Sequence, residues 1–348
     1  MRIYLDHNST APLRNEAKQA MVEAMSVVGN PSSVHLEGRA AKALIENARM
    51  KIAAAIGAVG ADIIFTSGAT ESAALALIGR DIACSKIEHE AVTSWCDVEL
   101  SVDRHGLVNI KKPSQSTLQV ANSETGIIQK SVAGLWLSDM TQAFGKVPLA
   151  FNWLGCNCAM ISAHKIGGPK GVGALIVKRG TDLAAQIKGG GQEMGRRSGT
   201  ENVIGIVGFG AAAEVAEKDL RSGKWEKISQ FRMILENMIE EFSDVPILIG
   251  KDSNRLPNTT CLVTPGWKGV TQVMQMDLEG IAVSAGSACS SGKVKSSDVL
   301  RAIGLEESDA SCALRISLGL NTTEEDVVRF AEIWTKKFEN NLKRKNRN

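Results

Sequence analysis

Short apolar runs alternate, over the first two thirds of the chain, with longer segments that carry apolar residues at helical spacing. The run Asp62-Ile63-Ile64-Phe65-Thr66 has the length and composition of a buried strand. It leads through a turn of small and hydroxyl residues, Ser67-Gly68-Ala69-Thr70, into a helical segment. Further strand-like runs lie at 82–87, 117–121, 135–138 and 158–161. This alternation predicts an α/β fold with a mostly parallel sheet.

Long helical patterns dominate after Thr200. The spacing of apolar residues predicts helices over 203–220 and 225–242. A last helix is predicted near the end of the chain, and Thr322 with Glu325 has the spacing of a capping box at its start.

The change from alternating strands and helices to long helices predicts two domains. We expect a large domain at 13–220, with a mostly parallel mixed sheet flanked by helices, and a smaller C-terminal α+β domain formed by 1–12 and 221–348. In open α/β sheets, ligands gather at the carboxyl ends of the strands. Polar residues that follow the predicted strands are therefore the candidates for function.

Composition excludes several classes of protein. Hydrophobic residues make up 44% and charged residues 22% of the chain, and the net charge of +2 gives no reason to expect nucleic acid or a membrane surface as a partner. No stretch reaches the roughly 18 apolar residues of a spanning helix, and the start, MRIYLDHNST, lacks the pattern of a signal peptide. These features predict a cytoplasmic protein.

The seven cysteines do not suggest a disulfide framework, because their number is odd and they are scattered. In a reducing compartment most are expected to be small buried residues, with one reactive thiol. Cys156 and Cys158 form a C-x-C pair, but without a second pair this is poor evidence for a metal site. No metal is expected.

A lysine after a predicted strand is the strongest local signal. Lys165 lies in Ser162-Ala163-His164-Lys165-Ile166-Gly167-Gly168, between the run 158–161 and the predicted strand 172–177. A lysine beside a hydroxyl and an imidazole can form a Schiff base while its neighbours hold an anion. The alternative is a solvated lysine in a glycine-rich hairpin.

Two further strand ends favour a cofactor site. Asp139 follows the run 135–138, and a carboxylate at this place could keep a pyridinium nitrogen protonated. The turn at 67–70 offers the N–H groups of a helix start and a hydroxyl, which suit a phosphate. An aspartate that merely caps its own turn is the competing interpretation of Asp139.

These segments, in this order, make the chain resemble the cysteine desulfurases of the class-V aminotransferase family, which depend on pyridoxal 5'-phosphate (PLP). The resemblance covers nearly the whole chain and implies the PLP-dependent transferase fold. It rests on Tyr4–Asn8, Gly29–Ser33, Thr66–Ser72, Glu88–Val92, Asp139–Gln142, Ser162–Lys165, Arg197–Thr200, Ser287–Cys289 and Leu314–Ser317.

Carried over position by position, the resemblance implies a complete cofactor site. Lys165 would be the Schiff-base lysine, and His89 would stack on the ring and assist proton transfer. Asp139 would pair with the pyridinium nitrogen and Gln142 with the phenolic oxygen. The phosphate would be held by Ala69, Thr70, Ser162 and His164, together with Thr200 of the partner subunit.

The resemblance also implies the substrate and the fate of its sulfur. Arg315 would clamp the carboxylate of L-cysteine, and Cys289 would take the sulfur as a persulfide. The sulfur would then pass to an acceptor protein, for example an iron–sulfur scaffold. A homodimer is expected, because the segment 189–200 carries glycines and two adjacent arginines that the chain's own core does not explain.

Two departures from the family pattern stand out. The motif Asn-Asn-Glu-x-Gly appears as Asn122-Ser123-Glu124-Thr125-Gly126, so that Ser123 replaces an asparagine that reaches both cofactor and substrate. Ser123 is therefore expected to contact both the cofactor and the substrate. Asn122 could take over the contact with the substrate. The stretches between His89 and Asp139 are also shorter than is usual in the family.

Three other functions compete. Gly208-Phe209-Gly210-Ala211-Ala212-Ala213 matches a dinucleotide fingerprint, but a helical segment precedes it instead of a strand, so we expect packing glycines. A related PLP lyase acting on selenocysteine is a closer rival. The third is a weakly active sulfur-transfer or assembly subunit of the same fold, which Ser123 keeps open.

Overall fold

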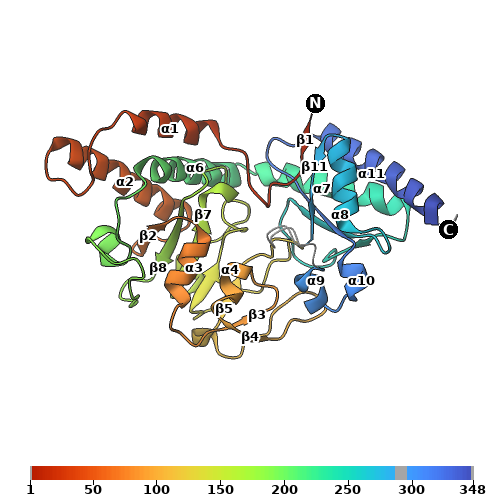
Figure 1. Cartoon of the computed structure of the whole chain (residues 1–348), viewed down its shortest axis with the longest axis horizontal. Helices are drawn as coiled ribbons and strands as arrows, with labels where there is room; N and C mark the ends of the chain where they lie inside the picture. The colour runs from red at the N-terminus through yellow and green to blue at the C-terminus, as the bar shows by residue number, and fades with distance from the viewer. Residues whose placement is uncertain (1, 287–295, 346–348) are drawn as a thin grey trace.

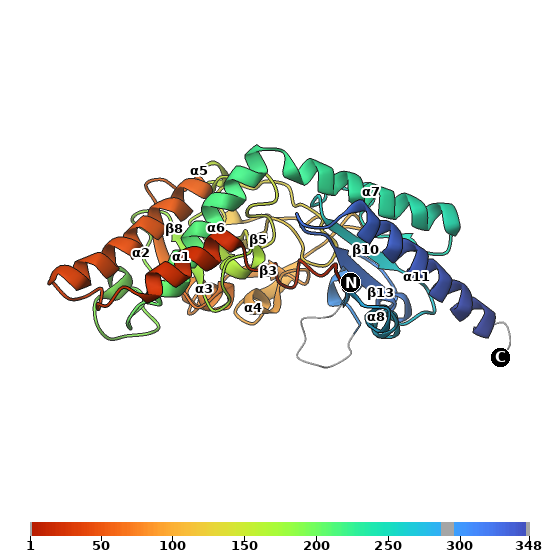
Figure 2. The ribbon, with the colours of Figure 1, turned by 90° about the horizontal axis from the view of Figure 1, so that it is seen from above.

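The computed structural model describes residues 2–286 and 296–345. The described chain forms an elongated molecule with two lobes (Figure 1). One lobe holds the larger sheet with helices α1 (Asn15–Met25), α2 (Leu36–Ala55) and α6 (Val203–Arg221). Seen from above, α7 (Lys224–Phe242) continues from α6 along one side of the molecule into the other lobe (Figure 2).

The main sheet has five strands in the order β2-β8-β7-β6-β5. Only β8 is reversed: it pairs antiparallel with β2 and β7, whereas β7, β6 and β5 pair in parallel. The expected mostly parallel, mixed sheet is thus confirmed. The reversal follows from the short glycine-rich connection between β7 and β8, which leaves no room for a crossover helix. The strands are β2 (Asp62–Thr66), β5 (Thr117–Gln119), β6 (Leu137–Asp139), β7 (Cys158–Ser162) and β8 (Gly173–Val177).

Two further strands lie beyond β5. β3 (Ala83–Ser85) pairs in parallel with β4 (Asp97–Leu100), and a single parallel bridge joins Ala83 to Ser116 just before β5. The predicted strand over 82–87 is therefore shorter than expected. It ends before Glu88 and His89, which lead into the short helix α4 (Glu90–Thr93).

Both faces of the sheet are buried, and successive residues of a strand point to opposite faces. In β7, Ala159 and Ile161 join the core beneath α1, α2 and α6, whereas Cys158 and Met160 join the core beneath α3 (Ala69–Leu77) and α4. A sheet covered on both faces needs continuous apolar strands, which explains the runs in the sequence.

Helix α6 owes its close packing to two glycines of the apparent dinucleotide fingerprint. A Cβ on Gly208 would lie 2.6 Å from Cγ of Met21 in α1, and one on Gly210 would lie 2.7 Å from Cα of Ala48 in α2. Both glycines lie inside a helix. The prediction that they are packing glycines is confirmed, and a dinucleotide loop is excluded here.

The second lobe is built on an antiparallel sheet in the order β12-β13-β10-β9. Its core combines Ile3 and Leu5 with residues between 228 and 338, including the ring cluster of Trp267, Trp334 and Phe338. The boundary between domains at residue 220 stays a prediction. The strands are β1 (Ile3–Tyr4), which pairs with β11 (Ile281–Ala282), then β9 (Ile247–Leu248), β10 (Thr259–Val263), β12 (Ser284–Ala285) and β13 (Ala313–Ser317).

The last helix begins one residue later than predicted. The reciprocal capping bonds join Thr323 and Asp326: each backbone N–H donates to the side chain of the other. Thr322 instead accepts a hydrogen bond from the N–H of Gly319, so the predicted pair with Glu325 is wrong. The remaining elements are α5 (Phe151–Leu154), α8 (Gly269–Leu278), α9 (Asp298–Ala302), α10 (Glu307–Ala310), α11 (Glu324–Lys345) and the 3-10 turns Pro113–Gln115, Ala163–Lys165 and Gln192–Gly195.

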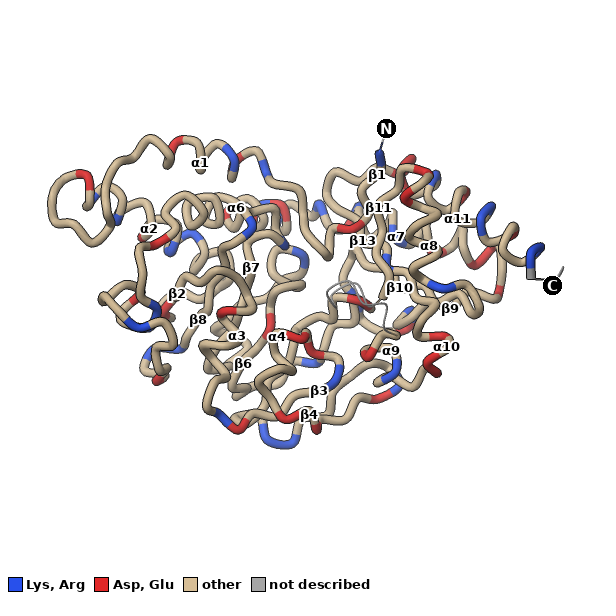
Figure 3. Tube along the Cα trace, in the orientation of Figure 1, with Lys and Arg blue, Asp and Glu red and all other residues tan. Residues whose placement is uncertain are grey.

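Along the residues that the structure describes, charges of the two signs are interspersed. Lys and Arg alternate with Asp and Glu along the trace in both lobes (Figure 3). Within the described residues, no helix has the length and apolar character needed to cross a membrane.

Candidate active site

A cavity of about 570 Å³ lies between the carboxyl ends of the main strands, the N-terminal segment and β13. Its volume is that of a site for a small molecule. Ten of the predicted site residues line it. They are Ala69, Thr70, His89, Ser123, Asp139, Gln142, Ser162, His164, Lys165 and Arg315.

Lys165 lies in the turn that follows β7, as predicted. Its Nζ donates to the backbone oxygens of Asn8, at 2.6 Å, and Ser9, at 2.9 Å. The N-terminal segment thus crosses to the large lobe and forms one wall of the cavity. Asn8 belongs to a motif that carries the family resemblance, but no local pattern indicates the contacts of Asn8 and Ser9, because their partner Lys165 lies more than 150 positions away.

Asp139 is the last residue of β6 and is 8% exposed. Burial raises the pKa of its carboxyl, and hydrogen bonds from Thr141 oppose this rise. The backbone N–H of Thr141 donates to Oδ1 at 2.8 Å. The side-chain oxygen of Thr141 is buried without a hydrogen-bond partner among the described residues. A polar ligand in the cavity would supply a partner for this hydroxyl.

The opposite end of the cavity suits an anion. Helix α3 begins at Ala69 with no side chain on its cap, so its first N–H groups face the turn 67–70. Gly173 of β8 approaches this turn so closely that a Cβ there would lie 2.7 Å from Cα of Gly68. Burial, followed by the charges of Lys165 and Lys170, lowers the pKa of His164 to about 4, so its imidazole is neutral.

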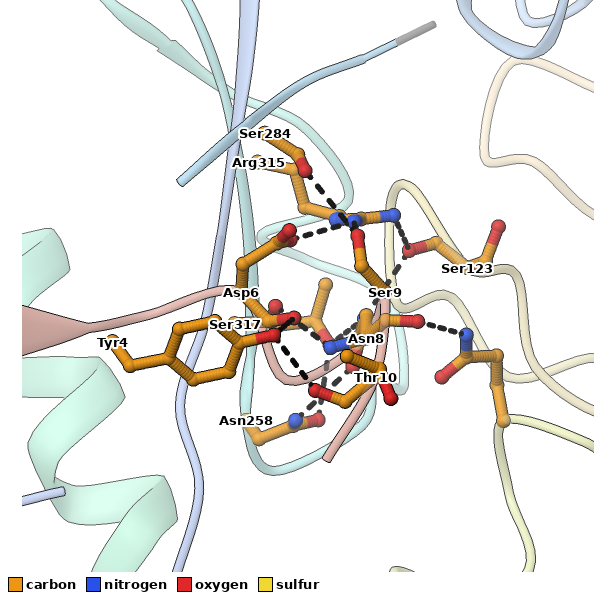
Figure 4. Close-up of polar contacts among 12 residues, drawn as sticks. Tyr4, Asp6, Asn8, Ser9, Thr10, Ser123, Asn258, Ser284, Arg315 and Ser317 are labelled. Atoms are coloured by element: carbon orange, nitrogen blue, oxygen red, sulfur yellow. Dashed lines mark hydrogen bonds and ion pairs between the residues drawn. The ribbon is translucent and has the colours of Figure 1, made fainter. Parts of the chain in front are cut away.

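Arg315, on β13, is 1% exposed and already has several partners. Its Nη2 contacts Oδ1 of Asp6 at 2.8 Å and Oγ of Ser9 at 2.7 Å, and its Nη1 donates to the backbone oxygen of Ser123 at 3.2 Å. Figure 4 shows the guanidinium between Asp6 and Ser123. Its Nε is buried without a partner among the described residues. The ion pair with Asp6 holds the guanidinium at the cavity wall.

His89 caps helix α4 and lines the cavity. Its Nδ1 accepts the N–H of Ala91 at 3.1 Å, so this nitrogen is the acceptor and the rest of the ring faces the cavity. Glu88 lies behind it, 5% exposed, and Oε1 accepts the N–H of Gln119 at 2.7 Å. Burial, reinforced by the charge of Asp139, raises the pKa of Glu88 well above its ordinary value.

Glu88 should make the protein less stable as pH rises. Between the ordinary carboxyl pKa of 4.5 and the raised pKa of the folded state, the folded chain holds a proton that the unfolded chain has lost. Stability therefore falls across this window by up to about 1.4 kcal/mol per pH unit. Glu88→Gln keeps the acceptor for Gln119 and cannot ionise, so its unfolding free energy should fall less between pH 5 and pH 8.

Urea unfolding at both pH values measures this difference. Glu90→Gln, at the exposed start of α4, is the matched control and should behave like the natural protein. Equal losses of stability in the natural chain and Glu88→Gln would show that Glu88 does not hold the extra proton.

Three predicted residues are not part of the cavity wall that the structure describes. Asn122 is buried, but its Oδ1 accepts three hydrogen bonds from Glu124 and Thr125, and its Nδ2 donates to the backbone oxygen of Ile87. Its amide holds this turn and does not reach the cavity. Thr200 is exposed. Cys289 lies outside the described residues.

Comparison with known proteins decides the family. The model of the class-V aminotransferases matches residues 3–330. This chain belongs to the class-V aminotransferase family.

Known members of this family align with nearly the full length of the chain. The chain is 40% identical to the cysteine desulfurase IscS of Dictyoglomus turgidum, over 93% of this chain and 91% of the relative. It is 38% identical to cysteine desulfurase IscS 1 of Archaeoglobus fulgidus, over 95% of both. Among solved structures, the NifS-like protein of Rickettsia africae superposes with a TM-score of 0.89 at 33% identity, covering 97% of this chain and all of that one.

Cysteine desulfurases of the class-V family use PLP, and the cavity fits this group. The anion end, formed by the start of α3 and the neutral His164, matches a phosphate. The buried carboxyl of Asp139 matches a ring nitrogen, and the unpartnered oxygen of Thr141 lies on the same wall. Lys165 lies where it can hold the cofactor covalently.

Proposed function

We propose that this protein is a PLP-dependent cysteine desulfurase that converts L-cysteine to L-alanine and transfers the sulfur to Cys289. The observation that carries the proposal is the convergence of Lys165, Asp139 and Arg315 from separate elements on one cavity. A solved structure of SspA in complex with cysteine, 29% identical with a TM-score of 0.77 over 93% of this chain, supports L-cysteine as the substrate.

Each of the cavity residues Asp139, Lys165 and His89 has a separate role in the proposed reaction. When bound, PLP draws electrons away from the substrate Cα. Asp139 would face the ring nitrogen and, when ionised, would hold the proton on it. Lys165 accepts the proton that leaves Cα, because its Nζ is the basic group beside the reacting centre. His89, on the cavity wall, can move a proton to or from the substrate.

Arg315 selects and orients the substrate. Its Nε has no partner among the described residues and its Nη1 contacts only the backbone oxygen of Ser123, so N–H groups remain for a carboxylate. Because Asp6 and Ser9 already fix Nη2, the guanidinium needs little rearrangement to bind. The carboxylate of a free amino acid is thus held at the second-lobe side of the cavity, with its Cα directed at Lys165.

The test is to load the purified protein with PLP and supply L-cysteine or L-selenocysteine. We expect a visible absorption band from lysine-bound PLP, and alanine with a protein persulfide from L-cysteine. Alanine from L-selenocysteine alone would favour the lyase alternative. A protein that acquires no absorption band with PLP would contradict the proposal.

We also propose a homodimer in which Thr200 completes the neighbouring site. Thr200 is exposed and is not part of its own cavity wall. The two arginines that motivated the dimer prediction have partners within the chain, since Arg196 pairs with Asp62 at 2.8 Å and Arg197 with Glu71 at 2.9 Å. They give no independent reason for a partner subunit. The support comes from the position of Thr200.

The segment that leads to Thr200 is firmly held. Both oxygens of Glu193, which is 6% exposed, contact Arg49 of α2, at 2.9 and 3.0 Å, and Oε2 also accepts the N–H of Phe65. Glu193 and Met194 adopt the left-handed backbone region, which is unfavourable for these side chains. These contacts argue against a loose surface loop.

Mixing two inactive variants tests whether Thr200 acts across the dimer. In a hybrid of one Lys165→Ala chain and one Thr200→Arg chain, both lesions fall in the same site if Thr200 belongs to the partner's cavity. Random exchange of equal amounts makes about half of the dimers hybrid, each with one intact site, so activity should return to about a quarter of the natural level. Each variant incubated alone is the control. Exchange without any recovery of activity would place Thr200 in its own subunit's site or in none.

A further inference from the structure

A second lysine lies buried beneath the cavity, close to the cofactor lysine. Lys146 follows β6 in the turn that begins with Thr141, and it is 3% exposed. Its Nζ donates to Oδ1 of Asn8 at 3.0 Å and to Oε1 of Gln142 at 2.9 Å. Both acceptors are neutral amides, and within the described residues no carboxylate pairs with it. Burying such a lysine is costly, so a use for it is expected.

The orientation of Asn8 is fixed independently of Lys146. Its Nδ2 donates to the backbone oxygen of Ser123 at 3.2 Å, an atom that can only accept, and to Oγ1 of Thr259 at 2.9 Å. Its Oδ1 must therefore point the other way, toward Lys146 and the amide nitrogen of Asn258. Figure 4 shows Asn8 at the centre of these contacts between the two lobes.

Lys146 and the backbone oxygen of Asn8 together fix the orientation of Gln142. An amide can rotate to exchange its oxygen and nitrogen, but the ammonium group of a lysine can only donate. Oε1 of Gln142 therefore faces Lys146, and Nε2 donates to the backbone oxygen of Asn8 at 2.9 Å. That oxygen also accepts from Lys165. Because Gln142 lines the cavity, its second N–H remains for a ligand.

The positive charges around Lys146 disfavour its protonated form. Burial, followed by the positive charges of Lys165 and Arg315, lowers the pKa of Lys146 well below its ordinary value. Burial and then Lys146 lower the pKa of His7 to about 4, so this neighbour is neutral. Any positive charge that Lys146 retains disfavours protonation of groups at Lys165.

We propose that Lys146 is a positioning residue that holds Gln142 as a hydrogen-bond donor toward the oxygen of the cofactor ring. This inference rests on the proposed function, because the acceptor belongs to PLP. Without Lys146, Oε1 of Gln142 loses its donor and only the contact of Nε2 with the backbone oxygen of Asn8 holds the amide, so the oxygen end can turn toward the cavity, where it would repel the negatively charged ring oxygen. Lys146 itself touches neither substrate nor cofactor and acts through Gln142.

The test compares Lys146→Met with the natural protein, both loaded with PLP. Methionine has a similar length but cannot donate. Loss of the donor destabilises the negative ring oxygen, so the midpoint of the pH titration of the visible absorption should rise by about one unit. The kcat for alanine formation should fall about tenfold with little change in KM. Lys146→Arg, which again only donates, should restore much of both.

Two controls separate this role from general damage. Lys224→Met removes a lysine near the same turn whose partner is Asp219, and it should leave the absorption midpoint unchanged. In a Gln142→Ala background, Lys146→Met should have little further effect on the midpoint if Lys146 acts through Gln142. If Lys146→Met does not fold, Lys146→Gln serves in its place.

Two results would overturn the inference. One is a midpoint unchanged in Lys146→Met whatever happens to kcat. The other is a shift that persists in full in the Gln142→Ala background. A natural protein that binds no PLP would instead contradict the proposed function, and the absorption of the natural protein distinguishes the two failures.

Discussion

Lys165→Ala should abolish the visible absorption of bound PLP and lower alanine production by at least about a thousandfold. In the structure Nζ of Lys165 lies in the cavity, held by the backbone oxygens of Asn8 and Ser9. Alanine removes both the covalent attachment and the base that accepts the Cα proton. The measurements are an absorption spectrum of the loaded protein and alanine formed from L-cysteine.

Lys178→Ala is the matched control for this variant. Lys178 follows β8, is exposed and lies outside the cavity wall, so its loss should change neither measurement. Circular dichroism should show that both variants are folded. If Lys165→Ala retained the absorption band and turnover, another lysine would hold the cofactor, and Lys170, which also lines the cavity, would be the next candidate.

Cys289→Ser should retain the absorption band of bound PLP and lose the protein persulfide completely. Cys289 lies outside the described residues, so this prediction rests on its sequence position and on the other six cysteines. Five of these are buried, and Cys96 is partly buried. Burial raises the pKa of the Cys156 and Cys158 thiols to about 12, which leaves about one in ten thousand as thiolate at pH 8.

Two more thiols are equally poor nucleophiles. Burial raises the pKa of Cys261, and a hydrogen bond with Cys96 followed by burial raises that of Cys84. Cys312 is 1% exposed, and its thiol donates to the backbone oxygen of Ser308 at 3.2 Å. Mass spectrometry after incubation with L-cysteine should find the extra sulfur on Cys289 in the natural protein and nowhere in Cys289→Ser. Sulfur found on Cys312 or Cys96 would contradict the assignment, and Cys312→Ser is the control.

The described chain enters the segment around Cys289 beside the cavity. Ser284 of β12 pairs with Arg315 of β13, and its hydroxyl lies 3.3 Å from that of Ser9. On the other side of the segment, Ser297 donates to Oε2 of Glu124 at 2.6 Å. The described residues on both sides of the segment thus contact residues at or beside the cavity wall.

Local sequence patterns predicted the main elements and most of the cavity. Strand-like runs followed by polar residues placed Asp139 and Lys165 correctly, because side-chain burial in a doubly covered sheet requires continuous apolar runs and leaves the polar ends for ligands. The glycines of α6 were also interpreted correctly, since a dinucleotide loop needs a preceding strand. These features depend only on neighbours in sequence.

Tertiary structure decided what depends on distant partners. The sequence showed two adjacent arginines but not Asp62 and Glu71, which pair with them after chain folding. The capping bonds of α11 moved from Thr322 to Thr323 because Thr322 is used by the turn at Gly319. The amide of Asn122 could have bound a ligand. Its oxygen and nitrogen are instead used in hydrogen bonds to Glu124, Thr125 and Ile87.

The sequence by itself determined the α/β fold, the polar residues at the strand ends that line the cavity and, through ordered motifs, the family. Only the tertiary structure brought Asn8 from the N-terminus between Lys146, Gln142 and Lys165, and set Asp6 against Arg315. Such contacts join residues more than 130 positions apart. No local periodicity encodes them, because they follow from the packing of two lobes around one cavity.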